Sequence, residues 1–338
     1  MDRLKAWGCE GALGSTKRLD NMDVRILRGL LTDTPYLRVQ TDIRKSYRDI
    51  ARKLGVSEDM VRERIGRLHK EGFIQGWTLG INPTLFGWKT SYLFFDTPSP
   101  AEKVRIIKRL MDVPGVLWIS DHLECFAGIM ISYADEEALY RHLESVSSIL
   151  SSKAFVRTDN QFPDVRMRLT ETDWRIIDSL KCDPRKPLGK TARELKISPR
   201  TVKRRLQRMI HERVFFVFPD LDLRRLQGSV VTTLAVFYLD KKFRRAVEDE
   251  IMSKYGDYYV FNPPTNPEYG AYSFILPSLS LAEELRDSVS ALPGVKRASN
   301  RHHAAIYNRL AKVFDEELAL RSPALNATGA AKMRPSMM

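Results

Sequence analysis

The sequence contains two copies of one pattern. Residues 19–27 read LDNMDVRIL and residues 169–177 read LTETDWRII. A second shared stretch, ARKLGVS at 51–57 and ARELKIS at 192–198, precedes a basic segment in each copy. The copies are offset by 150 and 141 residues, which is the size of a whole domain pair and too long for a solenoid repeat. The chain should therefore fold as two equivalent halves.

Length and composition exclude several classes of protein. The 338 residues, 43% of them apolar, can fill the cores of two to four small domains. No run of about 18 uncharged apolar residues is present, and residues 1–17 lack the apolar core of a signal peptide. We therefore expect a cytoplasmic protein with no membrane partner. Cys9, Cys125 and Cys182 are scattered, which predicts reduced thiols and neither a metal site nor a disulfide framework. We expect no cofactor.

The positive charge is concentrated in equivalent parts of the two copies. The net charge of the chain is +13. Residues 38–71 hold ten Lys or Arg against six Asp or Glu, and residues 183–213 hold eleven against three, which gives net charges of +4 and +8. Charge focused on one motif favours a polyanionic partner, with double-stranded DNA as the first candidate.

Each copy begins with the pattern of a winged helix-turn-helix. In the first copy we expect helices over 20–31, 46–54 and 57–71, and a short wing strand over 73–79. The third helix has a Ser57 cap and one apolar stripe of Val61, Ile65 and Leu68. The second copy repeats this order, with a Ser198-Pro199 start signal for its third helix and a wing over 214–218.

An α+β module follows each winged helix. Apolar and turn patterns predict the order β-α-β-β-α-β of the ferredoxin-like fold between 88 and 158, and again from 230 to a short last strand over 295–298. A closing helix is expected from Ile306 to Leu320. The fold class is thus α+β, with two winged helix-turn-helix domains alternating with two ferredoxin-like (βαββαβ) domains. The predicted divisions are a leader at 1–17, winged helices at 18–82 and 168–222, ferredoxin-like domains at 83–162 and 228–308, a C-terminal helix at 309–321 and a disordered tail at 322–338.

The arrangement resembles the leucine-responsive regulatory protein/AsnC (feast/famine) family. The resemblance rests on residues 19–27, on Ile50 to Ser57, on Val61 to Leu68, on Glu71-Gly72-Phe73-Ile74 and on Pro114-Gly115-Val116. The second copy departs from it at Glu212-Arg213-Val214. Family members carry one such unit and pair through their ferredoxin-like domains. The resemblance therefore implies a DNA-binding transcription regulator that is not an enzyme, built as an internal pseudo-dimer, with a homo-oligomer left open.

The third helix of each copy supplies the predicted DNA contacts. A recognition helix packs one face on its own core and places the other in the major groove. Arg and Gln suit bidentate contacts with guanine and adenine, and Lys and Arg neutralise phosphates. The predicted DNA-binding residues are Arg62, Arg64, Arg67, Lys70, Arg200, Lys203, Arg204, Gln207 and Arg208. Glu58 and Asp59 make the first helix mixed in charge, so two unlike half-sites are expected.

The family resemblance also implies a place for a small effector. Relatives bind an amino acid at the ferredoxin-like interface, next to a Gly-Asp turn that is replaced here by His122-Leu123-Glu124-Cys125. His122 and Glu124 are the candidate effector-binding residues, and an amino acid or another small molecule is the candidate ligand. Two alternative functions stay open at this point. They are a non-specific DNA-packaging protein and a sirohaem-decarboxylase-like enzyme, whose family shares the two-domain unit.

Overall fold

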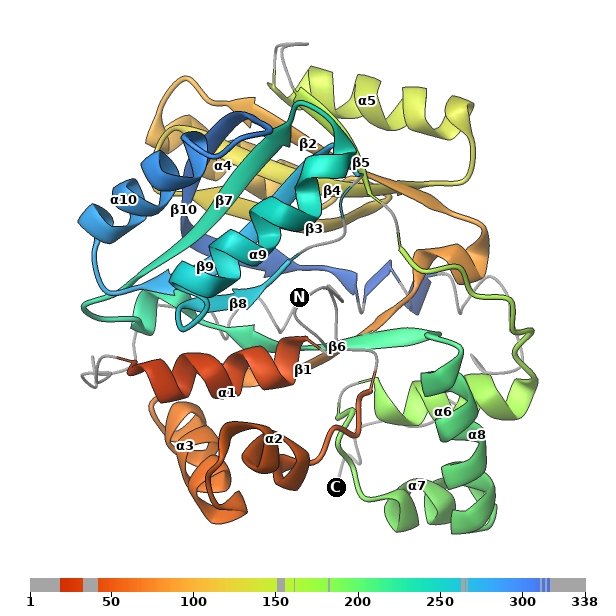
Figure 1. Ribbon diagram of the computed structural model, residues 1–338. Coiled ribbons are helices and arrows are strands. Elements are labelled where there is room, and N and C mark those ends of the chain that lie inside the picture. Colours follow the sequence, from red (N-terminus) through yellow and green to blue (C-terminus); the bar gives the residue numbers. More distant parts are fainter. Residues whose placement is uncertain are drawn as a thin grey trace, which may run out of the picture.

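The computed structural model describes residues 19–32, 42–150, 156–160, 162–181, 183–262, 265, 267–310, 312–313 and 315–316. The predicted leader and tail lie outside these ranges, as does part of the predicted C-terminal helix. The chain is α+β, with two helical heads side by side beneath a large assembly of strands and helices (Figure 1). In the described ranges, no helix is long and apolar enough to cross a membrane.

The two heads have the predicted three-helix form. The first consists of α1 (Asn21–Leu31), α2 (Tyr47–Leu54) and α3 (Glu58–Lys70), and the second of α6 (Glu171–Leu180), α7 (Leu188–Leu195) and α8 (Pro199–His211). Ser57 caps α3 by accepting a hydrogen bond from the Met60 amide, and Ser198 caps α8 in the same way. Gly55 ends α2 at φ +69°, a left-handed conformation that glycine adopts without strain.

The wing strands pair across the halves. Strand β1 (Ile74–Ile81) forms an antiparallel ladder with β6 (Phe215–Leu221), with Leu79 opposite Val217. The ladder also exchanges side chains, since Phe216 is buried in the core of the first head while Leu79 and Ile81 are buried in the core of the second. The close crossing uses Gly80, where an added Cβ would lie 2.2 Å from the Phe216 ring. Both heads are therefore attached to one two-stranded ribbon.

The remaining strands form an eight-stranded sheet in the order β5-β2-β4-β3-β10-β7-β9-β8. The predicted β-α-β-β-α-β order is confirmed in both halves. The first half contains β2 (Lys89–Asp96), α4 (Pro100–Leu110), β3 (Val116–His122), β4 (Phe126–Tyr133), α5 (Glu136–Leu150) and β5 (Val156–Asn160). The second contains β7 (Val230–Tyr238), α9 (Arg244–Tyr255), β8 (Tyr259–Phe261), β9 (Tyr269–Leu276), α10 (Leu279–Ser290) and β10 (Val295–Asn308). Short 3-10 turns, η2 (Pro83–Phe86), η3 (Leu223–Arg225) and η4 (Lys241–Phe243), connect these elements.

The last strand is much longer than the sequence pattern predicts. The expected strand over 295–298 continues to Asn308, so the prediction of a helix starting at Ile306 is wrong. The first part of β10 pairs with β7, and its second part pairs with β3 of the other half, with Ile306 opposite Ser120 and Tyr307 opposite Ile119. Pairing with a distant strand overrides the local helical spacing here. Helical residues begin at Leu310.

Candidate nucleic-acid interface

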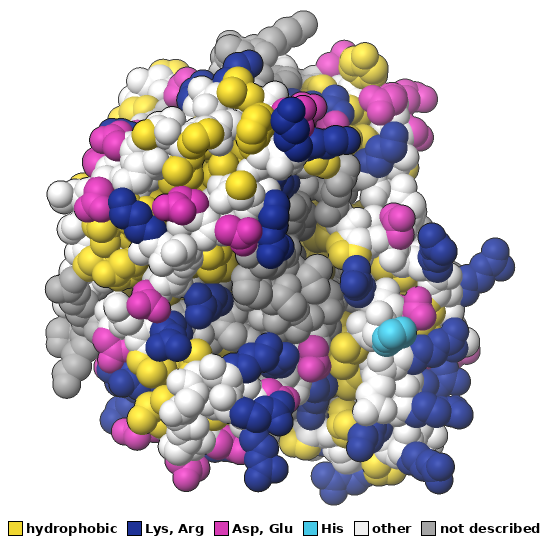
Figure 2. Space-filling view, viewed as in Figure 1, with side chains coloured by type: hydrophobic (Ala, Val, Ile, Leu, Met, Phe, Trp, Pro, Cys, Tyr) yellow, Lys and Arg dark blue, Asp and Glu magenta, His cyan; other side chains and the backbone are white. Residues whose placement is uncertain are grey.

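Helix α8 presents a basic surface away from the core of its head. Val202, Leu206 and Met209 are buried on one side. The opposite side carries the five predicted contact residues, all of them exposed: Arg200, Lys203, Arg204, Gln207 and Arg208. Among the described residues, none of these five side chains has a hydrogen-bond or ion-pair partner. Lys and Arg side chains gather over this head in the lower right of Figure 2. We call these five residues the α8 basic face.

Helix α3 presents a different surface, because most of its charges are paired. The exposed Arg62 donates to Glu58 one turn earlier at 2.7 Å, and its guanidinium lies 5.6 Å from the centre of the Tyr47 ring. Lys70 is exposed at the end of the helix. Glu58 and Asp59 lie in the first turn, where negative charge interacts favourably with the helix dipole. Helix α3 therefore carries acidic side chains in its first turn and basic ones further along, which is the mixture of charges that the sequence predicts.

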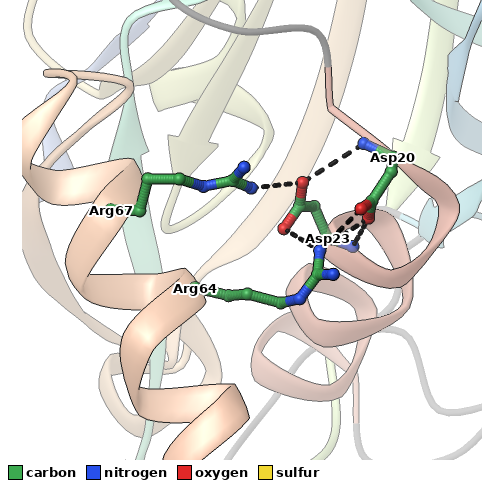
Figure 3. A network of polar contacts seen from close by, with 4 residues as sticks. All are labelled: Asp20, Asp23, Arg64 and Arg67. Atoms are coloured by element: carbon green, nitrogen blue, oxygen red, sulfur yellow. Dashed lines mark hydrogen bonds and ion pairs between the residues drawn. The ribbon is translucent and has the colours of Figure 1, made fainter.

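Arg64 and Arg67 are bound to their own head. The Asp23 carboxylate is fully buried, and it accepts from Arg64 Nη1 at 2.9 Å and from Arg67 Nη2 at 2.5 Å (Figure 3). Arg64 also donates to Asp20, the N-cap of α1, at 2.7 Å. Partial burial of Asp20 raises its pKa, but the hydrogen bond and charge of Arg64 and the bonds from the Asp23 and Met22 amides together outweigh this and leave the pKa below its ordinary value. The structure thus turns both arginines toward α1, and they join α3 to it.

The second head repeats one of these ion pairs and omits the other. Arg205 donates to the buried Asp173 at 3.0 Å and to Thr170 at 2.9 Å. Burial raises the pKa of Asp173, while its bonds with Thr170 and Arg205 lower it further than burial raises it. Arg208, which corresponds to Arg67 in the repeat, is exposed in the α8 basic face. The recurrence of Asp and Arg at the same positions in both copies is the sequence signal that could have identified these pairs.

The two candidate effector residues differ in burial. His122 was expected in a turn, but it is the last residue of β3 and only 3% exposed. Its ring lies 4.6 Å, centre to centre, from that of His303, the residue opposite it on β10. Glu124 is exposed, and its backbone oxygen accepts from Lys103 Nζ at 2.7 Å. A cavity of about 530 Å³ lies elsewhere, between the start of α1 and the second ferredoxin-like half, with Met22, Tyr258 and Ile275 in its lining.

Burial lowers the pKa of the two imidazoles at the β3–β10 junction. Desolvation lowers the pKa of His122 well below its ordinary value, and His303, Arg301 and Lys103 lower it further. Desolvation, followed by the charge of His302, lowers the pKa of His303 to about 4. His303 Nε2 is within 2.8 Å of Thr233 Oγ1, and His122 Nε2 is within 3.2 Å of Ser120 Oγ. The sequence does not predict this pair, because its members come from different halves.

Comparisons with known proteins agree with the two-headed organisation. The AsnC-type helix-turn-helix domain matches residues 19–69 and 169–210. The HTH-type transcriptional regulator Ptr1 of Methanocaldococcus jannaschii is 27% identical over 137 residues, which cover 40% of this chain and 82% of that protein. An uncharacterized HTH-type transcriptional regulator of Pyrococcus furiosus is 31% identical over 163 residues, 47% of this chain and 97% of that protein.

A solved structure shares the tandem arrangement over most of the chain. The siroheme decarboxylase NirDL superposes with a TM-score of 0.50 at 11% identity, over 88% of this chain and 98% of that chain. Its co-complex with an iron-uroporphyrin III analogue gives a TM-score of 0.51 at 12% identity, over 89% and 99% of the two chains. At this identity the likeness concerns the fold alone.

Proposed function

Because the chain belongs to the Lrp/AsnC family of helix-turn-helix proteins, we propose that it is a sequence-specific DNA-binding transcription regulator. The observation that carries the proposal is the α8 basic face, whose five side chains have no partner among the described residues. Long polar and basic side chains with no partner in the described part of the chain are available to phosphates and base edges. This availability distinguishes them from the paired arginines of α3.

In this proposal α8 lies in the major groove. Arg200, Arg204 and Arg208 carry planar guanidinium groups that can bind guanine in a bidentate manner, and Gln207 can do the same with adenine. Lys203, and any of these arginines that does not contact a base, neutralises phosphates and releases counterions. The binding affinity should therefore fall steeply as the salt concentration rises. Val202 and Leu206 hold the opposite side of the helix on the head.

Helix α3 reads a second, unlike half-site in this proposal. Arg62 and Lys70 are the exposed cations on it, while Arg64 and Arg67 act as positioning residues that hold α3 against α1 through Asp23. Glu58 and Asp59 repel phosphates and can accept from cytosine amino groups. The operator is therefore asymmetric, with its stronger half under α8.

The test is binding-site selection from random double-stranded DNA with the full chain. The selected site is then measured with the triple variant R200A/K203A/R204A and with the control K241A/K242A/R245A. The control removes the same charge from exposed positions in and beside α9. We expect the α8 variant to lose about 100-fold or more in affinity at fixed salt, since each bidentate base contact is worth about 1–3 kcal/mol. Equal affinity of the two triple variants would refute the α8 basic face as the DNA contact.

Two other functions give distinct results with the same protein. A DNA-packaging protein would bind the selected site and random competitor DNA about equally, whereas a specific regulator prefers its site by about 1,000-fold or more. A sirohaem-decarboxylase-like enzyme would bind a tetrapyrrole, and titration with an iron-uroporphyrin would then produce a shifted absorption band. We expect strong site preference and no such band.

A further inference from the structure

The two heads hold each other through a reciprocal pair of arginines. Arg44 lies in the loop before α2, and its Nη1 donates to the backbone oxygen of Lys186 at 2.8 Å and to that of Pro184 at 3.3 Å. Arg185 lies in the loop before α7, and its Nη2 donates to the backbone oxygen of Lys45 at 2.8 Å. Arg44 corresponds to Arg185 in the repeat, and Lys45 to Lys186. Each head therefore makes the same contact with the other.

Both loops are shaped in advance for this contact. Asp42 accepts from the Arg44 amide at 2.9 Å and from the Lys45 amide, through its backbone oxygen, at 3.0 Å. Asp183 accepts from the Arg185 amide at 3.2 Å and from the Lys186 amide at 3.0 Å in the same way. Because each turn is fixed by its own aspartate, little conformational entropy remains to be lost when the arginines engage.

Apolar and aromatic contacts continue the junction. Ile43, in the loop of the first head, is fully buried in the core of the second head. The Arg185 guanidinium lies 4.6 Å from the centre of the Tyr47 ring, and the Arg62 guanidinium of α3 lies 5.6 Å from the same centre. The loop of one head thus reaches, through one aromatic ring, a predicted DNA contact of the other.

The relative position of α3 and α8 is consequently fixed at two places. The β1–β6 ladder joins the heads at one end, and the Arg44–Arg185 junction joins them at another. Resting on the proposed function, we propose that this junction makes the protein specific for the spacing of its two half-sites, so that it binds double-stranded DNA only when they lie at one separation. In B-DNA a change of one base pair rotates one half-site by about 35° relative to the other, and a rigid pair of heads cannot follow that rotation.

The test varies the spacer of the selected site by one, two and five base pairs. The variant R44K/R185K keeps both charges but lacks the planar, two-pronged donor of arginine. The control R48K/R52K makes the same change at two exposed positions of α2, neither of which bonds to the second head among the described residues. For the wild type and the control, we expect one base pair of insertion or deletion to weaken binding by about 10-fold or more, the cost of a mismatched position. For R44K/R185K we expect less than about 3-fold.

Each outcome bears on one claim. Wild-type binding that is specific but indifferent to spacing overturns the inference and leaves the proposed function standing. A profile of R44K/R185K as sharp as that of the wild type overturns the role of the junction. A failure of selection to yield any sequence refutes the proposed function itself. If R44K/R185K is unfolded at the assay temperature by circular dichroism, the single variant R185K is judged by the same criteria.

Discussion

The Nη1 atom of Arg205 lies 3.0 Å from the buried Oδ1 atom of Asp173, and the first head repeats this relationship with Arg64 and Asp23 at 2.9 Å. In both heads the aspartate is the third residue of the first helix, and its carboxylate also accepts from the backbone of the N-cap residue. One buried carboxylate thus takes part in the N-terminal capping box of the first helix and also binds an arginine of the recognition helix. The repeat has kept this scaffold while the outward faces of α3 and α8 have diverged.

We expect Asp23→Ala to lower the free energy of unfolding of the first head. The change removes the carboxylate partner of Arg67 and one of the two carboxylates that hold Arg64, which keeps Asp20. Loss of one partner of a buried pair costs about 3–5 kcal/mol. Because both arginines are partly exposed, solvent screens them in part, and we expect the free energy of unfolding to fall by about 2 kcal/mol. Urea unfolding followed by circular dichroism measures it. Asp59→Ala, an exposed change on α3, is the control and should stay within about 0.5 kcal/mol.

Arg205 and Arg208 should separate stability from DNA binding. They lie one turn apart on α8, but Arg205 is held by Asp173 and Arg208 is free among the described residues. We expect Arg208→Ala to keep the melting temperature and to reduce the salt dependence of DNA binding by about one phosphate contact. Arg205→Ala should lower the melting temperature instead. The opposite pattern, with Arg205→Ala stable and deficient in DNA binding, would contradict the assignment.

Gly115 should tolerate no side chain. It lies in the turn before β3 at φ +78°, and an added Cβ would be 2.8 Å from the Ser132 backbone oxygen and from the His142 ring. We expect Gly115→Ala to destabilise the chain by about 1–3 kcal/mol in thermal unfolding. Gly66→Ala is the matched control, since nothing lies within 4 Å of its added Cβ inside α3. There alanine should stabilise by up to about 1 kcal/mol.

Local signals explain what the sequence predicts well. The Ser57 and Ser198 caps, the apolar stripes of α3 and α8 and the turn glycines act over a few residues, so they indicate helices and strands directly. Two features depend on distant partners and were missed. The sequence pattern predicts a wing strand over 73–79 but does not say which strand it pairs with. The pairing of β1 with β6 of the other half is seen only in the folded chain. Helical periodicity places Arg64 outward, yet the buried acceptor that turns it inward lies on another helix.

The same limit applies to the β3–β10 junction, where His122 and His303 meet from opposite halves. Neither residue has a local pattern that indicates burial, because a histidine that follows Asp121 or His302 fits an exposed turn equally well. The charged and titratable groups around the pair are Lys103 from α4, Asp121 from β3 and Arg301 and His302 from β10. With cations this close, a proton on either ring meets like charge as well as the cost of burial.

The stability of the chain should therefore fall between pH 6.5 and pH 4 in a way that depends on His303. In the unfolded chain histidine binds a proton at about pH 6.5, whereas burial lowers the pKa of His303 to about 4 in the folded chain. Between these values only the unfolded state is protonated, so stability is complete above pH 6.5 and decreases as the pH falls. We expect His303→Gln, which can keep the hydrogen bond to Thr233, to remove about 2 kcal/mol of this decrease. Urea unfolding at pH 7.5 and 4.5 measures the difference.

Replacement of the half-buried His142, whose pKa burial lowers less, should change the profile much less. Parallel pH profiles of the wild type and His303→Gln would show that His303 titrates alike in both states.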